Sequence, residues 1–541
     1  MFKMFKVISL LVAFALLITM AAGCGKKADT GETEQAATTA AATESVQATE
    51  ANPDGLPITD KPLELTMWKQ NNQKSEYSGE MDIWKRVAER TNISIKFVTV
   101  PFGDSKDLER ALALEVAAGA KYDIYQSGND TLNPHAQDGA FIEISDLVNQ
   151  YAPTIKKYLV DIKENAAMNT ANNGKMYVVS QMSAIRAKTG YFIRKDWMDK
   201  LSIKSPETPE DWVAMLTAFR DKDPNGNGQK DEIPFFTRTK LQGLFCFAST
   251  FGVDIYNESA FDIVDNKVVY NPIQPQFKDY LAFLNTLYKQ KLIDQEYLTR
   301  ANTFRDDAMK NNIGGSTFDW FGSTGSKADQ YAKEVAGMEF TVVAPPSITG
   351  KTKPYTRVQM EPVRNPAFAI SKNNKYPVES IKLLEYIFSD EGTILFNFGL
   401  EGKHYNVVDG KYVYTDAFKQ LASNIQESLQ ALGSGNMGYR QHVDYENANA
   451  SAKVSSEGRS LYENGIIQPA FPYLKMSEQE ATKFAELKTD VETYRDEMMN
   501  KFIIGSEPLD KFDEYVKTLK EKGIDEMLGI YQPAYERYLQ N

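Results

Sequence analysis

The sequence predicts an α/β protein with two lobes. Apolar and polar residues alternate over residues 63–68, which is typical of a strand, and a helix over residues 80–90 and a second strand over residues 93–100 follow. Strand and helix alternating at this spacing predict a parallel sheet. Once a non-globular N-terminal segment is set aside, about 480 residues remain. Two lobes are expected because one core rarely exceeds about 250–300 residues.

The next elements place the first candidates for a ligand site. A helix over residues 107–118 ends at a glycine, and a third strand over residues 122–126 leads into a polar loop. Ligands of such sheets lie beyond the carboxyl ends of the strands. Trp68, Asn129 and Asp130 stand at these ends, so we expect them near a ligand.

Later elements are indicated by helix-start signals and by apolar periodicity. Thr208 followed by Pro209 predicts a helix start, with a capping hydroxyl and proline at the first helical position. A strand is expected over residues 368–371 and a helix over residues 378–388. From Ser477, which has a glutamate three residues later, the C-terminal part is predicted to be mostly helical.

Residues 221–232 read D-K-D-P-N-G-N-G-Q-K-D-E, a spacing of oxygen-bearing side chains and glycines that predicts a structural calcium ion. One register begins at Asp221 and ends with Glu232 at position twelve, as in an EF-hand loop. A second register uses Asp223, Asn225, Asn227, the Gln229 carbonyl, Asp231 and Glu232. The alternative is a polar Asn-Gly turn that binds no metal.

The N-terminus predicts secretion and lipid anchoring. Lys3 and Lys6 precede an apolar run over residues 7–20, and small residues lead to Cys24. This order resembles a bacterial lipobox, although Ala21 stands where leucine is usual. Residues 1–23 are therefore predicted to be a lipoprotein signal peptide, and Cys24 the lipidated residue. An ordinary secretory signal or a short membrane helix is the alternative.

Residues 24–61 are predicted to be the lipidated cysteine and a disordered tether, because large apolar residues are almost absent there. The only other cysteine, Cys246, is expected in the core, so no disulfide is expected. The formal net charge of −12 argues against nucleic-acid binding. Neither a serine-nucleophile elbow nor a paired-histidine zinc motif nor a phosphate loop is present, so we do not expect an enzyme.

Aromatic faces and planar polar groups are what a sugar needs from its binding site. Trp68 and Trp320 are the candidate platforms, with burial in a core as the alternative. The polar candidates are Asn129, Asp130, Asp319, Glu361, Arg364 and His404. Arg364 could pair with a carboxylate of an acidic sugar, or form an ordinary salt bridge.

Several segments together resemble extracellular solute-binding proteins of family 1, in the lipoprotein branch that includes alginate-oligosaccharide binders. They cover residues 191–201, residues 208–234 with the calcium loop, residues 401–405 and residues 529–538. The resemblance implies a periplasmic-binding-protein fold, in which two lobes joined by a hinge close on a carbohydrate. It also implies calcium in the second register.

From this resemblance we expect a monomer, lipid-anchored outside the cell membrane, that delivers an oligosaccharide to the permease subunits of an ABC importer. The folded part, residues 62–541, is expected to form lobe 1 from residues 62–185 and 325–385, and lobe 2 from residues 186–324 and 386–541. A peptide or another solute as ligand, or a sugar sensor feeding a membrane kinase, are the alternatives.

Overall fold

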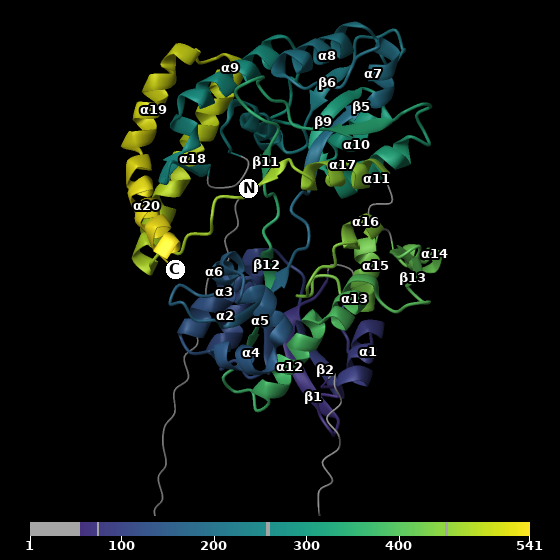
Figure 1. Cartoon of the computed structure of the whole chain (residues 1–541), viewed down its shortest axis with the longest axis vertical. Helices are drawn as coiled ribbons and strands as arrows, with labels where there is room; N and C mark the ends of the chain where they lie inside the picture. Colours follow the sequence, from purple (N-terminus) through teal and green to yellow (C-terminus); the bar gives the residue numbers. More distant parts are fainter. Residues whose placement is uncertain (1–54, 73–74, 256–259, 423–424, 450–452, 541) are drawn as a thin grey trace, which may run out of the picture. The chain divides into compact units, whose positions relative to one another are not determined.

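The computed structural model describes residues 55–72, 75–255, 260–422, 425–449 and 453–540. The predicted signal peptide, Cys24 and residues 25–54 of the predicted tether lie outside these ranges. The described chain forms two main sheets with helices packed around them, which confirms the predicted two-lobed α/β fold class (Figure 1). No helix in these ranges is both long and apolar enough to span a membrane.

The first sheet has five strands in the order β2-β1-β3-β12-β4. Its strands are β1 (Leu63–Gln70), β2 (Ile93–Val100), β3 (Ile124–Ser127), β4 (Val178–Met182) and β12 (Val363–Ile370). The first three pair in parallel, as predicted from the alternating strands and helices. Strand β12, for which the sequence predicts no direction, runs antiparallel to β3 and β4. Its partners, β3 and β4, are far away in the sequence, so no local pattern reveals this pairing.

Helices cover both faces of this sheet. Successive residues of a strand point to opposite faces, so apolar side chains at neighbouring positions are buried in two different clusters. In β1, Met67 packs into one apolar cluster with Trp84, and Trp68 packs into the other with Leu112. The helices that accompany this sheet are α1 (Asp82–Thr91), α2 (Ser105–Ala117), α3 (Asn129–Gln137), α4 (Ser145–Tyr151), α5 (Pro153–Leu159), α6 (Lys163–Asn169), α12 (Pro377–Phe388), α13 (Asp390–Phe398), α14 (Asp416–Lys419), α15 (Ile425–Leu432) and α16 (Tyr445–Asn449).

The second sheet has four strands in the order β10-β5-β9-β6. They are β5 (Thr189–Arg194), β6 (Ile233–Phe236), β9 (Gly314–Trp320) and β10 (Phe340–Val343). Three short hairpins or strand pairs complete the strands: β7 (Phe261–Val264) with β8 (Lys267–Tyr270), β11 (Thr356–Arg357) with β15 (Ile467–Gln468), and β13 (Tyr405–Val408) with β14 (Lys411–Tyr414).

The remaining helices pack mainly with the second sheet, and those after residue 477 form the predicted helical C-terminal part. They are α7 (Lys195–Leu201), α8 (Pro209–Asp221), η1 (Lys240–Phe251), η2 (Asn271–Ile273), α9 (Pro275–Lys289), α10 (Phe304–Lys310), α11 (Phe321–Tyr331), α17 (Lys453–Glu463), α18 (Glu478–Ile504), η3 (Leu509–Lys511), α19 (Phe512–Glu521) and α20 (Ile524–Gln540). Helices α18 and α20 lie side by side (Figure 1). The predicted capping boxes at Thr208 and Ser477 are present.

The division of the chain between the sheets differs from the expected lobe boundaries. Strand β10, expected in lobe 1, pairs with β5 of the second sheet. Residues after 386, expected in lobe 2, enter the cluster of the first sheet, for example Phe396 and Tyr414. The sequence around these residues does not show to which sheet they belong, because a four-residue strand and isolated aromatic residues fit either core equally well.

Two side chains from other parts of the chain bind the segment that connects β4 to β5. The Oε1 atom of Glu463 accepts the N–H groups of Arg186 and Ala187, both at 2.8 Å. The Oε1 atom of Gln359 accepts those of Lys188 and Thr189, also at 2.8 Å. These contacts satisfy backbone donors that have left one sheet and not yet joined the next.

Candidate functional site

A pocket of about 670 Å³ lies at the ends of strands from the first sheet and is also lined by residues of the second. Lys69 at the end of β1 and Gln126 and Ser127 at the end of β3 line it from one side, and Lys188 and Trp320 from the other. This is where a ligand of an α/β sheet is expected, beyond the carboxyl ends of its parallel strands.

A bulge in β12 places three consecutive residues in the pocket wall. The pairing of β12 with β4 shifts register between Arg364 and Ala367, and Arg364, Asn365 and Pro366 line the pocket. The Oδ1 atom of Asn365 accepts the backbone N–H of Asn129 at 2.8 Å, which ties the bulge to the start of α3. A bulge of this kind redirects side chains at the end of a strand.

Trp320 presents an accessible aromatic surface to the pocket. It is 44% exposed, whereas Trp68, Trp84, Trp197 and Trp212 are buried. The ammonium group of Lys188 lies 5.2 Å from the centroid of its ring. An exposed indole beside polar groups is suited to stack on the C–H face of a sugar ring.

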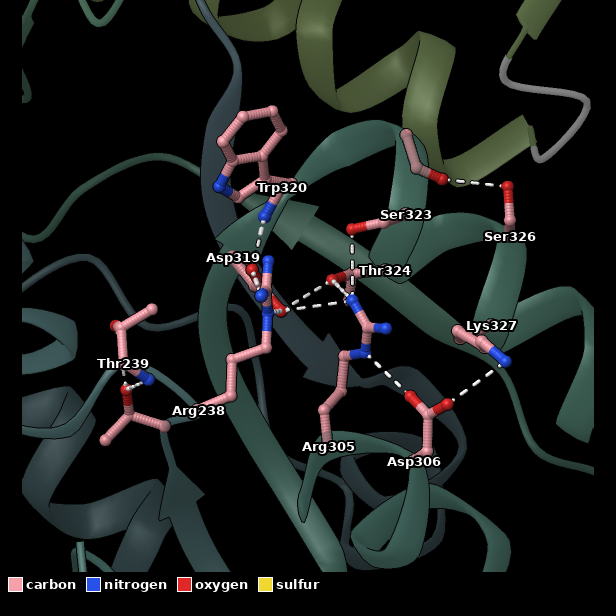
Figure 2. A network of polar contacts seen from close by, with 12 residues as sticks. Arg238, Thr239, Arg305, Asp306, Asp319, Trp320, Ser323, Thr324, Ser326 and Lys327 are labelled. Atoms are coloured by element: carbon pink, nitrogen blue, oxygen red, sulfur yellow. Dashed lines mark hydrogen bonds and ion pairs between the residues drawn. The ribbon is translucent and has the colours of Figure 1, made fainter. Parts of the chain in front are cut away.

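Asp319 lies behind this tryptophan and forms a charge network instead of lining the pocket (Figure 2). It is 3% exposed, and Nε of Arg238 lies 2.8 Å from its Oδ2 atom. Nη1 of Arg305 lies 3.5 Å from the same oxygen. Asp319, predicted as a ligand residue, therefore does not line the pocket in this structure, because its carboxylate is enclosed by protein donors.

Trp68 and His404 are likewise placed in the cores. Trp68 is 2% exposed and stacks on Tyr125 with ring centroids 5.8 Å apart. The Nδ1 atom of His404 accepts the N–H of Leu400 at 3.0 Å, its Nε2 atom lies 3.1 Å from Asp82, and burial lowers its pKa. Neither residue lines the pocket. For Trp68 the reason is that a position at a strand end does not decide which face of the sheet a side chain takes.

The other polar candidates divide between the pocket and its surroundings. Asp130 and Arg364 line the pocket. Asn129 stands behind it, and its side-chain amide donates to the carbonyl of Met168 at 3.4 Å. Glu361 is exposed and is not among the lining residues. Of the eight predicted ligand residues, the structure thus brings together Asp130, Trp320 and Arg364.

Several lining residues carry polar atoms that sequence reasoning did not single out. Oε1 of Gln126 and Oγ of Ser127 are buried with no hydrogen-bond partner among the described residues. Lys69 is buried, donates to the carbonyl of Gln70 at 2.9 Å, and has its pKa lowered by desolvation. Their position at the ends of predicted strands was the sequence signal that could have identified these residues. Buried polar atoms left without partners are what a ligand's hydroxyl groups would satisfy.

A further set of lining residues comes from the segment after α15, including Asn436, Gln441, Glu446 and Arg459. Nη2 of Arg459 lies 3.5 Å from the carboxylate of Glu446, and Gln441 donates to Glu446 at 3.0 Å. No local pattern marks this segment as part of a site, because it reaches the pocket only through the tertiary fold.

The predicted calcium loop connects α8 to β6 and is folded tightly on itself. Oδ1 of Asp223 accepts the N–H groups of Gly226 and Asn227 at 2.9 and 3.0 Å. The side-chain amides of Asn225 and Asn227 donate to Asp231 at 3.0 and 2.9 Å. Asp221, the first residue of the alternative register, instead pairs with Arg220 at 2.7 Å.

Glu232 at the end of this loop is the residue whose environment is unusual. Both carboxylate oxygens are buried and accept no hydrogen bond from the described residues. Desolvation, together with the negative charges of Asp231 and Asp223, raises its pKa. Within the described part of the chain, no three Asp, Glu, His or Cys side chains form a metal cluster. The donor set of the loop is accordingly a mixture of carboxylate, amide and carbonyl oxygens, the oxygen types that calcium takes.

A two-sheet α/β fold with a pocket lined from both sheets is typical of solute-binding proteins. Residues 72–394, more than half of the chain, match the family described as bacterial extracellular solute-binding protein. The chain belongs to this family.

Similar proteins include transporter components and lipoproteins. The chain is 22% identical to the fructooligosaccharide ABC transporter substrate-binding protein FusA of Streptococcus pneumoniae, over 90% of this chain and 92% of that protein. It is 25% identical to the lipoprotein LipO of Bacillus subtilis, over 74% of this chain and 78% of that protein. It is 22% identical to the polygalacturonan/rhamnogalacturonan-binding protein YtcQ of the same species, over 84% and 88%.

Among solved structures, the alginate-binding protein AlgQ2, crystallised without calcium ion, is similar with a TM-score of 0.69 and 29% identity. The similarity covers 88% of this chain and 99% of that one. A solute-binding protein for human milk oligosaccharides (HMO) from Bifidobacterium longum infantis has the same TM-score at 18% identity, over 89% and 99% of the two chains. The second likeness supports the fold.

Proposed function

We propose that this protein captures an oligosaccharide in the pocket beside Trp320 and delivers it to an ABC importer. The observation that carries the proposal is the exposed indole of Trp320 in a pocket whose walls also carry polar side chains. Stacking on Trp320 would orient a sugar ring, and Gln126, Ser127 and Arg364 would bind its hydroxyl or carboxylate groups.

The relatives support a sugar as the ligand, since their names include fructooligosaccharide, polygalacturonan and alginate binding. They include both neutral and acidic sugars, and the pocket offers groups for both. Lys69 and Arg364 line it, and neither belongs to an ion pair found in the described structure. The guanidinium group of Arg364 would favour a carboxylate on the ligand, whereas desolvation lowers the pKa of Lys69 and favours its neutral form.

The protein is further proposed to work outside the cell membrane, held there by a lipid on Cys24. The order of basic residues, apolar run, small residues and cysteine supports this proposal. The similarity to a lipoprotein of Bacillus subtilis agrees with it. Replacement of Cys24 by alanine should release the protein from the membrane fraction, and equal membrane retention of this variant would contradict the anchor.

A structural calcium ion is proposed for the loop between α8 and β6. Asp223, Asn225, Asn227, the Gln229 carbonyl, Asp231 and Glu232 would hold it. The buried, unpaired oxygens of Glu232 support the proposal, because a cation would supply the partner they lack. Rotation of the Asn225 and Asn227 amides would turn their oxygens toward Asp231, and such flips cost little change in shape.

The binding proposal is tested by calorimetry of the soluble form, residues 25–541, against kestose, alginate oligomers, oligogalacturonides and a peptide mixture. Binding of a sugar without its hydrolysis, weakened by Trp320→Ala, is the expected result. Binding of peptides alone would replace the carbohydrate by a peptide. Binding of a sugar, with import unaffected when the protein is removed from cells, would favour the sensor alternative.

A further inference from the structure

The residue directly before Trp320 is enclosed by protein groups that also define the position of that tryptophan. Asp319 is a buried residue near the end of β9, and its Oδ1 atom accepts the backbone N–H of Trp320 at 2.8 Å. Its Oδ2 atom accepts the hydroxyl of Thr324, in the first turn of α11, at 2.8 Å. One carboxylate thus bonds to both sides of the junction between strand and helix at which Trp320 stands.

Two arginines from separate elements hold this carboxylate (Figure 2). Nε of Arg238, which follows β6, donates to both oxygens of Asp319 at 3.0 and 2.8 Å. Nη1 of Arg305, on α10, lies 3.5 Å from Oδ2 and donates to the hydroxyls of Ser323 and Thr324 at 3.0 and 3.2 Å. Ser323 itself lines the pocket, so the network reaches a second residue of the pocket wall.

The network continues outward with alternating charges. Nε of Arg305 donates to Asp306 at 3.0 Å, and Nζ of Lys327 lies 3.0 Å from the other oxygen of that carboxylate. Charge-assisted bonds of this kind are shorter and stronger than neutral ones, and they constrain direction as well as distance. Asp319 is the only carboxylate in the network shared by two guanidinium groups, so its loss would leave both without this partner.

Trp320 is also fixed on its other sides. The N–H of Phe321 donates to the carbonyl of Lys188 at 2.8 Å, and the ammonium group of Lys188 lies over the indole ring. The backbone is thereby bound before and after Trp320, while the ring keeps its exposed surface at the pocket. Binding sites need such support, because a ligand-contacting side chain loses affinity when the residues behind it leave it loose.

We propose that Asp319, held by Arg238 and Arg305, is the positioning residue that sets the direction of the Trp320 ring for stacking on the ligand. This inference rests on the proposed function, in which Trp320 stacks on a sugar. Asp319 has no contact with the ligand itself. Its main effect on affinity passes through Trp320.

The first test needs no ligand. Trp320 is the one exposed tryptophan of the five, so quenching of tryptophan fluorescence by acrylamide reports mainly on it. Asp319→Asn keeps the side-chain shape and removes the charge, and it should change the quenching constant by about twofold. Asp294→Asn is the matched control. Asp294 is buried, pairs with Arg300 at 2.8 Å in the same half of the protein, and does not line the pocket.

Both variants should lower the melting temperature, because each breaks a buried ion pair. Only Asp319→Asn should change the quenching of Trp320. An unchanged quenching constant in Asp319→Asn, or the same change in Asp294→Asn, would overturn the positioning role. This result stands apart from the proposed function, since the measurement is made without any sugar.

The second test is a double-mutant cycle measured with whichever oligosaccharide gives the largest calorimetric signal. Asp319→Asn should weaken binding about tenfold in the native protein and less than twofold in a Trp320→Ala background, because the two act on one contact. Asp294→Asn should leave affinity unchanged in both. Equal losses in the two backgrounds would show that Asp319 acts independently of Trp320. Absence of binding by every sugar would refute the proposed function, leaving the quenching result to decide the positioning role.

Discussion

Replacement of Glu232 by glutamine separates the two roles that this residue would have with and without calcium. Without metal, its buried carboxylate lies near the charges of Asp223 and Asp231, and neither of its oxygens has a well-formed hydrogen bond from the described residues. Glutamine removes the charge at nearly the same volume. A buried charge without a partner costs more than a neutral buried polar group, for which the cost is about 1–3 kcal/mol, so the metal-free variant should be more stable than the native protein.

Calcium should reverse this order. A ligand that binds only the folded state stabilises it by about 2.7 kcal/mol at 100 times its Kd. With roughly 2.1 cal/mol/K of unfolding entropy per residue over roughly 490 folded residues, this raises the Tm of the native protein by about 3 °C. Glu232→Gln removes a ligand from the site and should lose most of that rise.

The assay is calorimetric melting of both proteins in chelator and in millimolar calcium. Asp221→Asn is the control, because Asp221 pairs with Arg220 and lies outside the second register. It should keep the calcium response. Loss of the response in Asp221→Asn would favour the first register, and an equal response in the native protein and Glu232→Gln would refute the role given to Glu232.

The same carboxylate predicts a dependence on pH. Desolvation raises the folded-state pKa of Glu232 above its unfolded value. Its favourable contribution to the metal-free fold is therefore fully present below the unfolded pKa and is lost as pH rises through the folded pKa. In chelator, the native protein should gain stability relative to Glu232→Gln as the pH falls toward about 4.5. A constant difference between the two proteins would contradict the stated environment.

The remaining predictions concern residues that the structure moves into or out of the site. Trp68→Ala should cost about 3–5 kcal/mol of stability, since Trp68 is buried, yet leave ligand affinity unchanged below the melting range; a selective loss of affinity would return Trp68 to the site. Burial lowers the pKa of His404, so the stability that the neutral imidazole contributes is present above the unfolded pKa of about 6.5 and is lost as pH falls through the lower folded pKa. His404→Gln should therefore flatten the fall in Tm between about pH 7 and 5. Parallel curves of Tm against pH for the two proteins would refute this. Arg364→Gln should weaken oligogalacturonide binding about tenfold and kestose binding less than threefold by calorimetry, with exposed Arg86→Gln as control; equal losses for both sugars would exclude a carboxylate partner.

Sequence signals predicted well those helices and strands whose formation depends on residues close together in the sequence. Alternation revealed β1 and β2, and capping hydroxyls marked the starts of α8 and α18 within a residue. These signals depend on neighbours in sequence, because a cap satisfies N–H groups two or three residues away. The antiparallel placement of β12 depends instead on strands far away in the chain.

The pocket was predictable in part for the same reason. Trp68 and Trp320 both stand near strand ends, yet only Trp320 is exposed. Which tryptophan reaches the ligand depends on strand face and on the packing around it, neither of which composition specifies. Asp319 has the chemistry of a sugar-binding residue, but two arginines distant in sequence enclose it. Gln441 and Glu446 carried no motif at all.

The most direct test of the central claim is a titration of the soluble protein with oligosaccharides, followed at once by calorimetry and by tryptophan fluorescence. A sugar that binds on Trp320 should give a saturable heat and, at the same midpoint, a change in fluorescence and protection from acrylamide. In Trp320→Ala the fluorescence change should disappear with its reporter, and the affinity measured by calorimetry should fall at least tenfold. Tight sugar binding that leaves the fluorescence and the Trp320→Ala affinity unchanged would contradict the account, because it would place the ligand away from Trp320.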